Sequence, residues 1–181
     1  TLANFTDGWE VGGGKGIADS LVVASLSTAI CLVLGFPAAY ALARRFPPHG
    51  QLSFTILSLR MLPPIVPVIG FYLLFQKLSL WDTYAGRIIV YTVMNLPLVI
   101  WLLAEFIRQI PTTYEEAARI DGAPWWRLFW DVLLPLSAPG ILTAGILAMI
   151  FAWNEFLFAL VLTGETVITL PKALASFFLF Q

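Results

Sequence analysis

The most constraining feature of this chain is the distance it runs without a charged side chain. Asp19 and Arg44 enclose 24 uncharged residues, and Asp131 and Glu155 enclose 23. The hydrocarbon core of a bilayer is about 30 Å thick, and a helix of about 20 apolar residues crosses it. Each of these two runs is therefore long enough to span a membrane as one helix.

Two further apolar runs are shorter. Sixteen uncharged residues separate Arg60 from Lys77, and 17 separate Arg87 from Glu105. Both reach spanning length when one polar residue is included. Stretches that are apolar on every side do not alternate as the strands of a membrane barrel do. The predicted fold is all-α, a polytopic transmembrane domain over residues 17–178 with spans at about 17–43, 52–76, 84–107 and 137–162.

Composition supports a membrane location and excludes several other classes. The chain is 59% hydrophobic and 12% charged, whereas soluble domains carry about 25% charged residues. A net charge of −1 argues against nucleic-acid binding. The lone Cys31 excludes an internal disulfide framework and a multi-thiolate metal site. No catalytic residue and no metal ligand set is predicted for this chain.

The N-terminal residues 1–16 are polar and rich in glycine, so we expect an external loop there. Its Gly-Lys pair does not make a phosphate-binding loop, because Trp9 stands where that pattern needs glycine and Gly16 where it needs Ser or Thr. The chain opens without an initiator Met, and its last stretch turns apolar as it stops. We expect the middle of a longer protein, without a span at one or both ends.

The longest connection between spans, residues 109–136, has the pattern of two short helices. Thr112 with Glu115 matches a capping box, and the same pattern recurs one step later with Thr113 and Glu116. Gly122 suits the left-handed position after a helix, and Pro124 suits the first position of a second helix. The sequence therefore predicts a loop with regular helical structure rather than an irregular one.

This loop carries a resemblance to a known family. Residues 114–123 read YEEAARIDGA, and 132–135 read VLLP. The spacing is similar throughout to the EAA loop of permeases of binding-protein-dependent ABC importers, whose pattern is Glu-Ala-Ala, three residues, Gly, nine residues and Ile-x-Leu-Pro. The one departure is Val132 in place of Ile.

Other segments resemble the carbohydrate-uptake branch of that family. They are RMLPP at 60–64, WDTY at 81–84 and AWNEF at 152–156. Within the branch, the chain most resembles the second membrane subunit of the maltose transporter, the MalG type. Six spans are usual in such subunits, so the resemblance implies that this chain holds the second to the fifth.

The resemblance implies a sugar permease that forms half of a translocation pathway. Its implied partners are a homologous second permease, two ATP-binding subunits, an external solute-binding protein and the sugar. ATP and Mg would be bound by the ATP-binding subunits, and this chain would hold no cofactor and catalyse no reaction. The residues implied to couple to the ATPase are Tyr114, Glu115, Glu116, Ala117, Ala118, Asp121, Gly122 and Pro135, with Glu116 the expected ATPase contact.

Residue spacing agrees with this role for the loop. Ala118 and Gly122 are four apart, with Ala117 beside them and Tyr114 one turn earlier, so a short helix would present a bare flank to another backbone. The alternative is a generic amphipathic hairpin on the membrane surface, whose acidic pair favours the helix N-terminus. The arginines beside the loop favour a cytoplasmic position for it, although they outnumber the basic residues on the other side of the membrane only slightly. The resemblance implies that the protein lies in the inner membrane.

Polar residues at membrane depth are candidates for the substrate pathway, because charges there are costly and face a wet interior. Arg60 either lines the pathway, pairs with an acid or extends to the surface. Asn154 and Glu155 either contact sugar hydroxyls or join helices, and Asn95 either lines a cavity or packs helices. Small residues repeat every four positions in the last span, at Gly140, Ala144, Ala148 and Ala152, which predicts close packing against this bundle or another subunit.

Two other functions remain open from the sequence. One is an ABC permease for another solute, such as glycerol phosphate, a peptide or an amino acid. The other is a secondary transporter, for which only Glu155 and Glu105 offer membrane carboxylates. The sequence does not identify the sugar.

Overall fold

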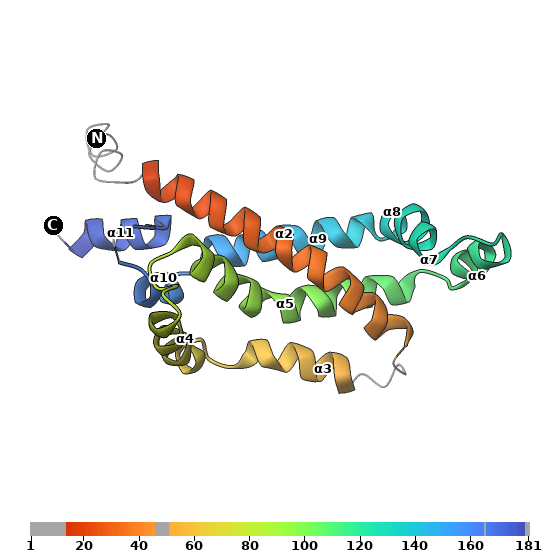
Figure 1. Cartoon of the computed structure of the whole chain (residues 1–181), viewed down its shortest axis with the longest axis horizontal. Coiled ribbons are helices and arrows are strands. Elements are labelled where there is room, and N and C mark those ends of the chain that lie inside the picture. The colour runs from red at the N-terminus through yellow and green to blue at the C-terminus, as the bar shows by residue number, and fades with distance from the viewer. Residues whose placement is uncertain (1–13, 46–50, 165, 180–181) are drawn as a thin grey trace.

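The computed structural model describes residues 14–45, 51–164 and 166–179, and every regular element in these ranges is a helix (Figure 1). The predicted external loop falls mostly on residues 1–13, outside the described residues. Its last three positions are already helical, because the first described helix, α2, begins at Gly14.

Three helices form the centre of the bundle. They are α2 (Gly14–Arg44), α5 (Tyr84–Gln109) and α9 (Ala138–Trp153), and each packs against the other two. Helices α2 and α5 are long and apolar enough to cross a membrane by themselves. They cover the spans predicted at 17–43 and 84–107.

The span predicted at 52–76 is not one straight helix. It consists of α3 (Gln51–Ser58), a 3-10 turn at Leu59–Met61 and α4 (Ile65–Lys77), with a bend of 79° between the two halves. Pro63 and Pro64 follow the turn, and proline has no N–H to continue a helical ladder. The bend places the Arg60 side chain at a helix break.

The span predicted at 137–162 is also interrupted. Helix α9 ends at Trp153, and α10 (Leu157–Leu162) begins after a three-residue break. The Asn154 amide donates to the Ile150 carbonyl, and Glu155 Oε1 accepts from the N–H groups of Leu157 and Phe158. These side chains end one helix and cap the next, since short polar groups compete with the backbone ladder.

Before α9, the chain forms a run of short helices that includes the predicted loop. They are α6 (Thr113–Ile120), α7 (Trp125–Arg127), a π-helical segment at Leu128–Leu133 and α8 (Leu134–Leu136). This run bends by 69° where it meets α9. The last described helix, α11 (Leu170–Leu179), lies at the opposite end of the bundle (Figure 1). We call these two ends the α6 end and the α11 end.

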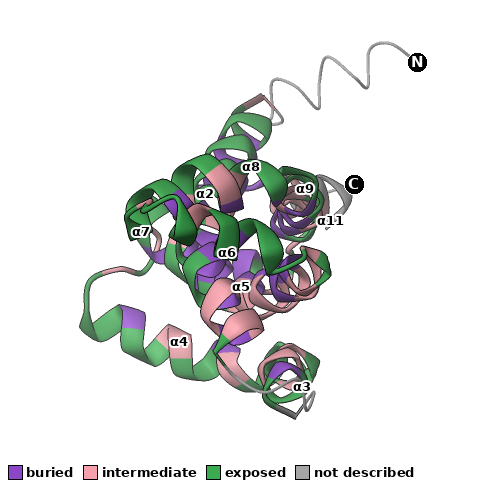
Figure 2. Ribbon diagram, turned by 90° about the vertical axis from the view of Figure 1, so that its right-hand side faces the viewer, coloured by how far each residue is buried: buried purple, intermediate pink, exposed green. Residues whose placement is uncertain are grey.

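The predicted small-residue ridge is buried inside this chain's own bundle. Gly140, Ala144, Ala148 and Ala152 are all buried, in the region where α9 faces α2 and α5 (Figure 2). A Cβ at position 140 would lie 2.6 Å from Cγ of Phe106 on α5. The ridge therefore allows close approach of helices within the chain.

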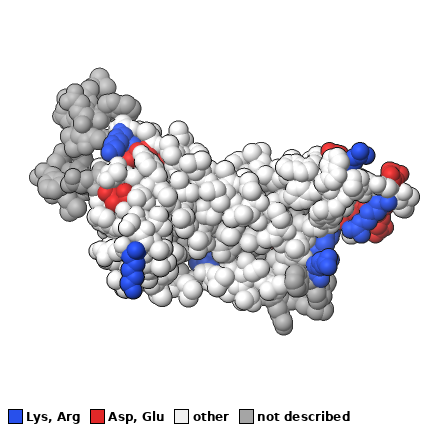
Figure 3. All heavy atoms as spheres, viewed as in Figure 1, with Lys and Arg blue, Asp and Glu red and all other residues white. Residues whose placement is uncertain are grey.

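The outer surface of the bundle is suited to lipid. Large apolar side chains such as Val33, Met61 and Leu142 are 66–73% exposed. On the face drawn in Figure 3, acidic and basic side chains gather at the two ends, and the surface between them is uncharged apart from one basic patch. Up to four membrane spans are present if each bent pair counts as one. This distribution is that of a polytopic membrane domain.

Acidic side chains fix the chain at the α11 end. Asp19 Oδ2 accepts from the Ile168 N–H at 2.8 Å, and Asp82 Oδ2 accepts from the Thr166 N–H at 3.0 Å. Although desolvation tends to raise the pKa of the Asp82 carboxyl, hydrogen bonds from Thr166 and from the backbone of Gly164 and Val167 hold it below its usual value. The start of α2 is thereby tied to the segment that leads into α11.

Gly140→Ala is expected to lower the free energy of unfolding by about 1–3 kcal/mol, because an added methyl in a packed interior forces its neighbours apart. Gly70→Ala is the matched control, since Gly70 also lies inside a helix but a Cβ there meets nothing within 4 Å. Thermal unfolding of the purified protein in detergent micelles compares the two variants. An unchanged midpoint for Gly140→Ala would contradict the close contact with Phe106.

Candidate functional site

Helix α6 does not begin with the predicted capping box. Thr112 has helical backbone angles (φ −63°, ψ −19°), and its side chain caps nothing. A capping residue needs a non-helical conformation, so its hydroxyl cannot turn toward the N–H groups of the first turn. The Glu115 carboxylate is not available for the box either, because it is turned toward α2.

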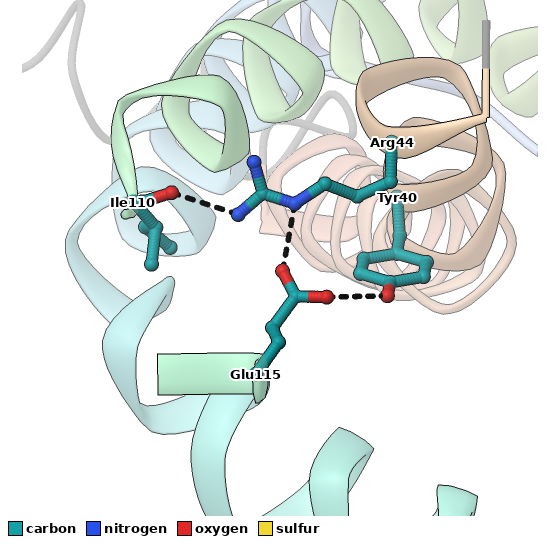
Figure 4. Close-up of polar contacts among 4 residues, drawn as sticks. All are labelled: Tyr40, Arg44, Ile110 and Glu115. Carbon is teal, nitrogen blue, oxygen red and sulfur yellow. Dashed lines mark hydrogen bonds and ion pairs between the residues drawn. The ribbon is translucent and has the colours of Figure 1, made fainter. Parts of the chain in front are cut away.

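Glu115 is the buried polar centre of this end of the molecule (Figure 4). Its side chain accepts from the Tyr40 hydroxyl at 2.7 Å through one oxygen and from Arg44 Nε at 2.7 Å through the other. Arg44 also donates from Nη2 to the Ile110 carbonyl at 2.8 Å, just beyond the end of α5. Glu115 is 5% exposed. One carboxylate thus joins α6, α2 and the end of α5.

Aromatic packing holds the segments that follow α6 against α2. The ring of Trp125 lies 5.2 Å from that of Tyr40, and the ring of Phe129 lies 5.2 Å from that of Phe36 at an interplanar angle of 76°. Such tilted and edge-on pairs are favourable beyond the area that they bury. The π-helical segment therefore packs against α2, the same helix that Glu115 contacts.

Gly122 ends α6 in the predicted left-handed conformation, with φ of +73°. Its N–H donates to the Arg119 carbonyl at 3.0 Å, and the N–H of Ala123 donates to the Ala118 carbonyl at 2.9 Å. These two bonds make a Schellman motif. Pro124 differs from the prediction by one position, because it is the residue before α7 rather than its first helical residue.

The predicted coupling residues divide between two faces of α6. Tyr114, Glu116, Ala117, Asp121 and Gly122 are exposed, whereas Glu115 is buried and Ala118 is partly buried against the core. The prediction that Ala118 shares the bare outward flank with Gly122 is therefore wrong.

Position in the helix explains this division, because residues that follow one another point in different directions around the axis. Pro135 is exposed in α8, at the 69° bend before α9.

Within the bundle, Arg60 and Asn95 meet at a small cavity. Arg60 Nη1 donates to the Met94 carbonyl at 2.8 Å and to Asn95 Oδ1 at 2.9 Å, and its guanidinium lies 4.3 Å from the centre of the Phe151 ring. The Asn95 amide donates to the Tyr91 carbonyl at 3.0 Å. Arg60 is thus tied to α5 beside the cavity, where its side chain stays partly exposed.

Glu155 faces the same cavity from the break between α9 and α10. The cavity has a volume of about 130 Å³ and is lined by Arg60, Pro64, Tyr91, Met94, Asn95, Phe151 and Glu155. Arg60 and Glu155 form no direct ion pair in the part of the chain that the structure describes. Asn154 does not line the cavity, because its exposed side chain bonds back to Ile150.

Sequence reasoning missed three residues that these sites require. Tyr40 and Arg44 hold Glu115, and Phe151 covers the Arg60 guanidinium. Arg44 stood out only as a basic residue at the end of a span, which predicts orientation rather than a partner. Across residues 14–45, 51–164 and 166–179, no group of three or more His, Cys, Asp or Glu side chains is placed to hold a metal ion.

Comparison with known proteins gives consistent similarities. Residues 31–179 match the family described as binding-protein-dependent transport system inner membrane component. The chain is 39% identical over 98% of its length to a putative ABC transporter permease, ORF2, of Caldicellulosiruptor sp. (strain Rt8B.4), of which it covers 65%. It is 42% identical over 89% of its length to the trehalose transport system permease SugB of Mycobacterium tuberculosis, of which it covers 60%.

A further relative and a solved structure extend these similarities. The melibiose/raffinose/stachyose import permease MelC of Bacillus subtilis is 33% identical over 97% of this chain, which covers 65% of MelC. The chain therefore spans less than two thirds of the length of these relatives. A bacterial ABC transporter involved in the import of the acidic polysaccharide alginate is 26% identical, with a TM-score of 0.71 over 89% of this chain and 56% of the other.

Gly122→Ala is expected to destabilise the end of α6 by about 1–2 kcal/mol, because a left-handed conformation is costly for a residue with a Cβ. Nothing lies within 4 Å of an added Cβ, so the effect isolates backbone conformation from crowding. Hydrogen exchange of the α6 amides measures the change, and about tenfold faster exchange corresponds to 1.4 kcal/mol. Gly122→Asn is the matched control, since Asn tolerates this conformation. Equal protection in Gly122→Ala and the parent would contradict the Schellman assignment.

Proposed function

Because this chain belongs to the family of inner membrane components of binding-protein-dependent transport systems, we propose that it forms half of the translocation pathway of an ATP-driven sugar importer. The relatives named for trehalose and for melibiose, raffinose and stachyose support a sugar as the transported solute. Its partners would be a homologous second permease, two ATP-binding subunits and an external solute-binding protein. ATP and Mg would be bound by the ATP-binding subunits, and this chain would catalyse no reaction.

In this proposal, α6 is the helix that contacts an ATPase subunit on the cytoplasmic side of the inner membrane. The observation that carries it is the division of α6 into two faces. One face is fixed to the bundle by Glu115, and the other presents Tyr114, Glu116, Ala117 and Gly122 to solvent. A helix with one face bonded to the bundle and the other exposed can bind a partner and pass the partner's movement to the bundle, since a rigid body transmits displacement.

The cavity beside Arg60 is the proposed part of the substrate pathway in this chain. Arg60, Asn95 and Glu155 supply donors and acceptors, and they meet where two helices are broken. Interrupted helices at membrane depth are typical of transporter binding sites, because unwound segments expose polar groups only toward a cavity. Asn154 is a weaker candidate for sugar contact, since it lies outside the cavity lining.

Glu116→Lys is expected to reduce co-purification of the ATP-binding subunits by at least about tenfold, because truncating or reversing an interfacial charge costs 2–5 kcal/mol or more. Asp131→Lys is the matched control, since it makes the same charge change at an exposed position of the same end. Affinity purification of the complex from membranes, followed by quantification of the ATPase subunit, measures the effect. Normal co-purification of Glu116→Lys, or an equal loss in Asp131→Lys, would contradict the proposed contact.

Glu155→Gln is expected to raise the half-saturating sugar concentration by about tenfold, the equivalent of 1.4 kcal/mol. Glutamine keeps an acceptor oxygen for the N-terminus of α10, so the change tests the charge rather than the helix cap. The measurement is sugar-stimulated ATP hydrolysis by the reconstituted complex over a panel of trehalose, melibiose, raffinose and alginate oligomers. Glu105→Gln, at the α6 end, is the control. Unchanged affinity and unchanged selectivity in Glu155→Gln would remove this residue from the pathway.

A further inference from the structure

Two adjacent glutamates of α6 have opposite environments. Glu116 is exposed, whereas Glu115 is 5% exposed and has both oxygens engaged by residues of α2. We propose that Glu115 is a positioning residue that locks α6 to α2, so that the two helices move as one body; this inference rests on the coupling role proposed for α6. Glu115 therefore acts through Arg44 and Tyr40 rather than by touching the ATPase.

The length of α6 explains why it needs such a lock. The helix has eight residues, and isolated helices shorter than about 12–15 residues are marginal in water. Its principal packing partner is the π-helical segment Leu128–Leu133, to which it is joined through the turn at Gly122. The described polar contact between α6 and a spanning helix is the one made by Glu115.

The geometry of the contact fixes both position and direction. Arg44 Nε and the Tyr40 hydroxyl approach different oxygens of the carboxylate, each at 2.7 Å, so rotation of the carboxylate breaks at least one bond. Charge-assisted bonds of this kind are shorter and stronger than neutral ones. The second Arg44 bond, to the Ile110 carbonyl, uses an acceptor that the end of α5 leaves free. The lock thereby includes α5 as well.

Helix α2 runs from the α6 end of the bundle to the α11 end. It has 31 residues and is about 46 Å long at 1.5 Å per residue. At the α11 end, Asp19 accepts from Ile168 and Ser20 accepts from the N–H of Leu170. A displacement of α6 that is passed to α2 therefore reaches residues 168–170 at the opposite end.

A distance measurement tests the lock without requiring a known sugar. Spin labels are placed on Arg119 of α6 and Ala38 of α2, both exposed, in a Cys31→Ala background. The complete complex in lipid nanodiscs is compared without nucleotide and after trapping with ATP and vanadate. In the parent we expect one narrow distance distribution that is the same in both states. In Glu115→Gln we expect the distance distribution to broaden or to split into more than one peak.

Further variants separate the lock from general damage. Glu116→Gln is the matched neighbour and should keep the narrow distribution. Arg44→Gln should reproduce Glu115→Gln, and the double variant should be no broader than either single variant, which a merely additive loss of packing would not give. Tyr40→Phe removes one of the two bonds to Glu115 and should broaden the distance distribution less than Glu115→Gln does. It replaces the Arg44 and Glu115 variants as the test if those fail to insert.

The outcomes distinguish this inference from the function on which it rests. A distribution as narrow in Glu115→Gln or Tyr40→Phe as in the parent would overturn the lock, even with ATPase subunits bound normally. The nucleotide-free distribution is also measured on the permease without ATPase subunits. Failure of those subunits to co-purify with the parent would overturn the docking proposal, while the width in Glu115→Gln would still decide the lock.

Discussion

The cost of an unpaired polar group away from water governs this structure. In hydrocarbon, each backbone N–H and carbonyl must be hydrogen-bonded within the protein. A charged side chain must either pair with other polar groups or lie at the membrane surface. On the face drawn in Figure 3, the charges of the described residues accordingly lie mainly at the two ends of the bundle. Away from the ends, Arg60 and Glu155 lie at helix breaks, where each has specific partners. At the α6 end, the buried Glu115 is paired in the same way.

The same constraint links the cavity to the α6 end. At the cavity, two spans are broken and the Arg60 and Glu155 side chains turn inward, which gives a small cavity with polar groups in its lining. At the α6 end, a short helix that would be unstable alone is fixed to α2 by a buried carboxylate. Helix α2 contacts α5 and α9, so both features share one rigid support. The proposed function needs such a connection, because ATP hydrolysis outside the membrane would have to open a site within it.

The sequence predicted the features that local rules determine. Uncharged runs located α2 and α5, and the four-residue repeat located the buried face of α9, because burial follows helical periodicity. Gly122 was predicted from its need for a left-handed angle. The capping box failed because its glutamate found a partner 71 residues away, and no local pattern reports such a partner. The break at 154–156 was likewise hidden, since hydropathy averages across a break, whereas Pro63 and Pro64 indicate the interruption at 62–64. For Asn154 and Glu155, adjacency in sequence gave no indication that only Glu155 would face the cavity.

The central claim is that one face of α6 receives the ATPase while the other holds α2. The most direct test is an electron cryo-microscopy structure of the assembled transporter in its resting and ATP-bound states. We expect the Glu116 carboxylate to lie within hydrogen-bonding distance of a basic side chain of the ATPase subunit, and the Glu115–Arg44 pair to persist in both states. An α6 helix that does not contact the ATPase, or a Glu115 carboxylate separated from Arg44 in either state, would contradict it.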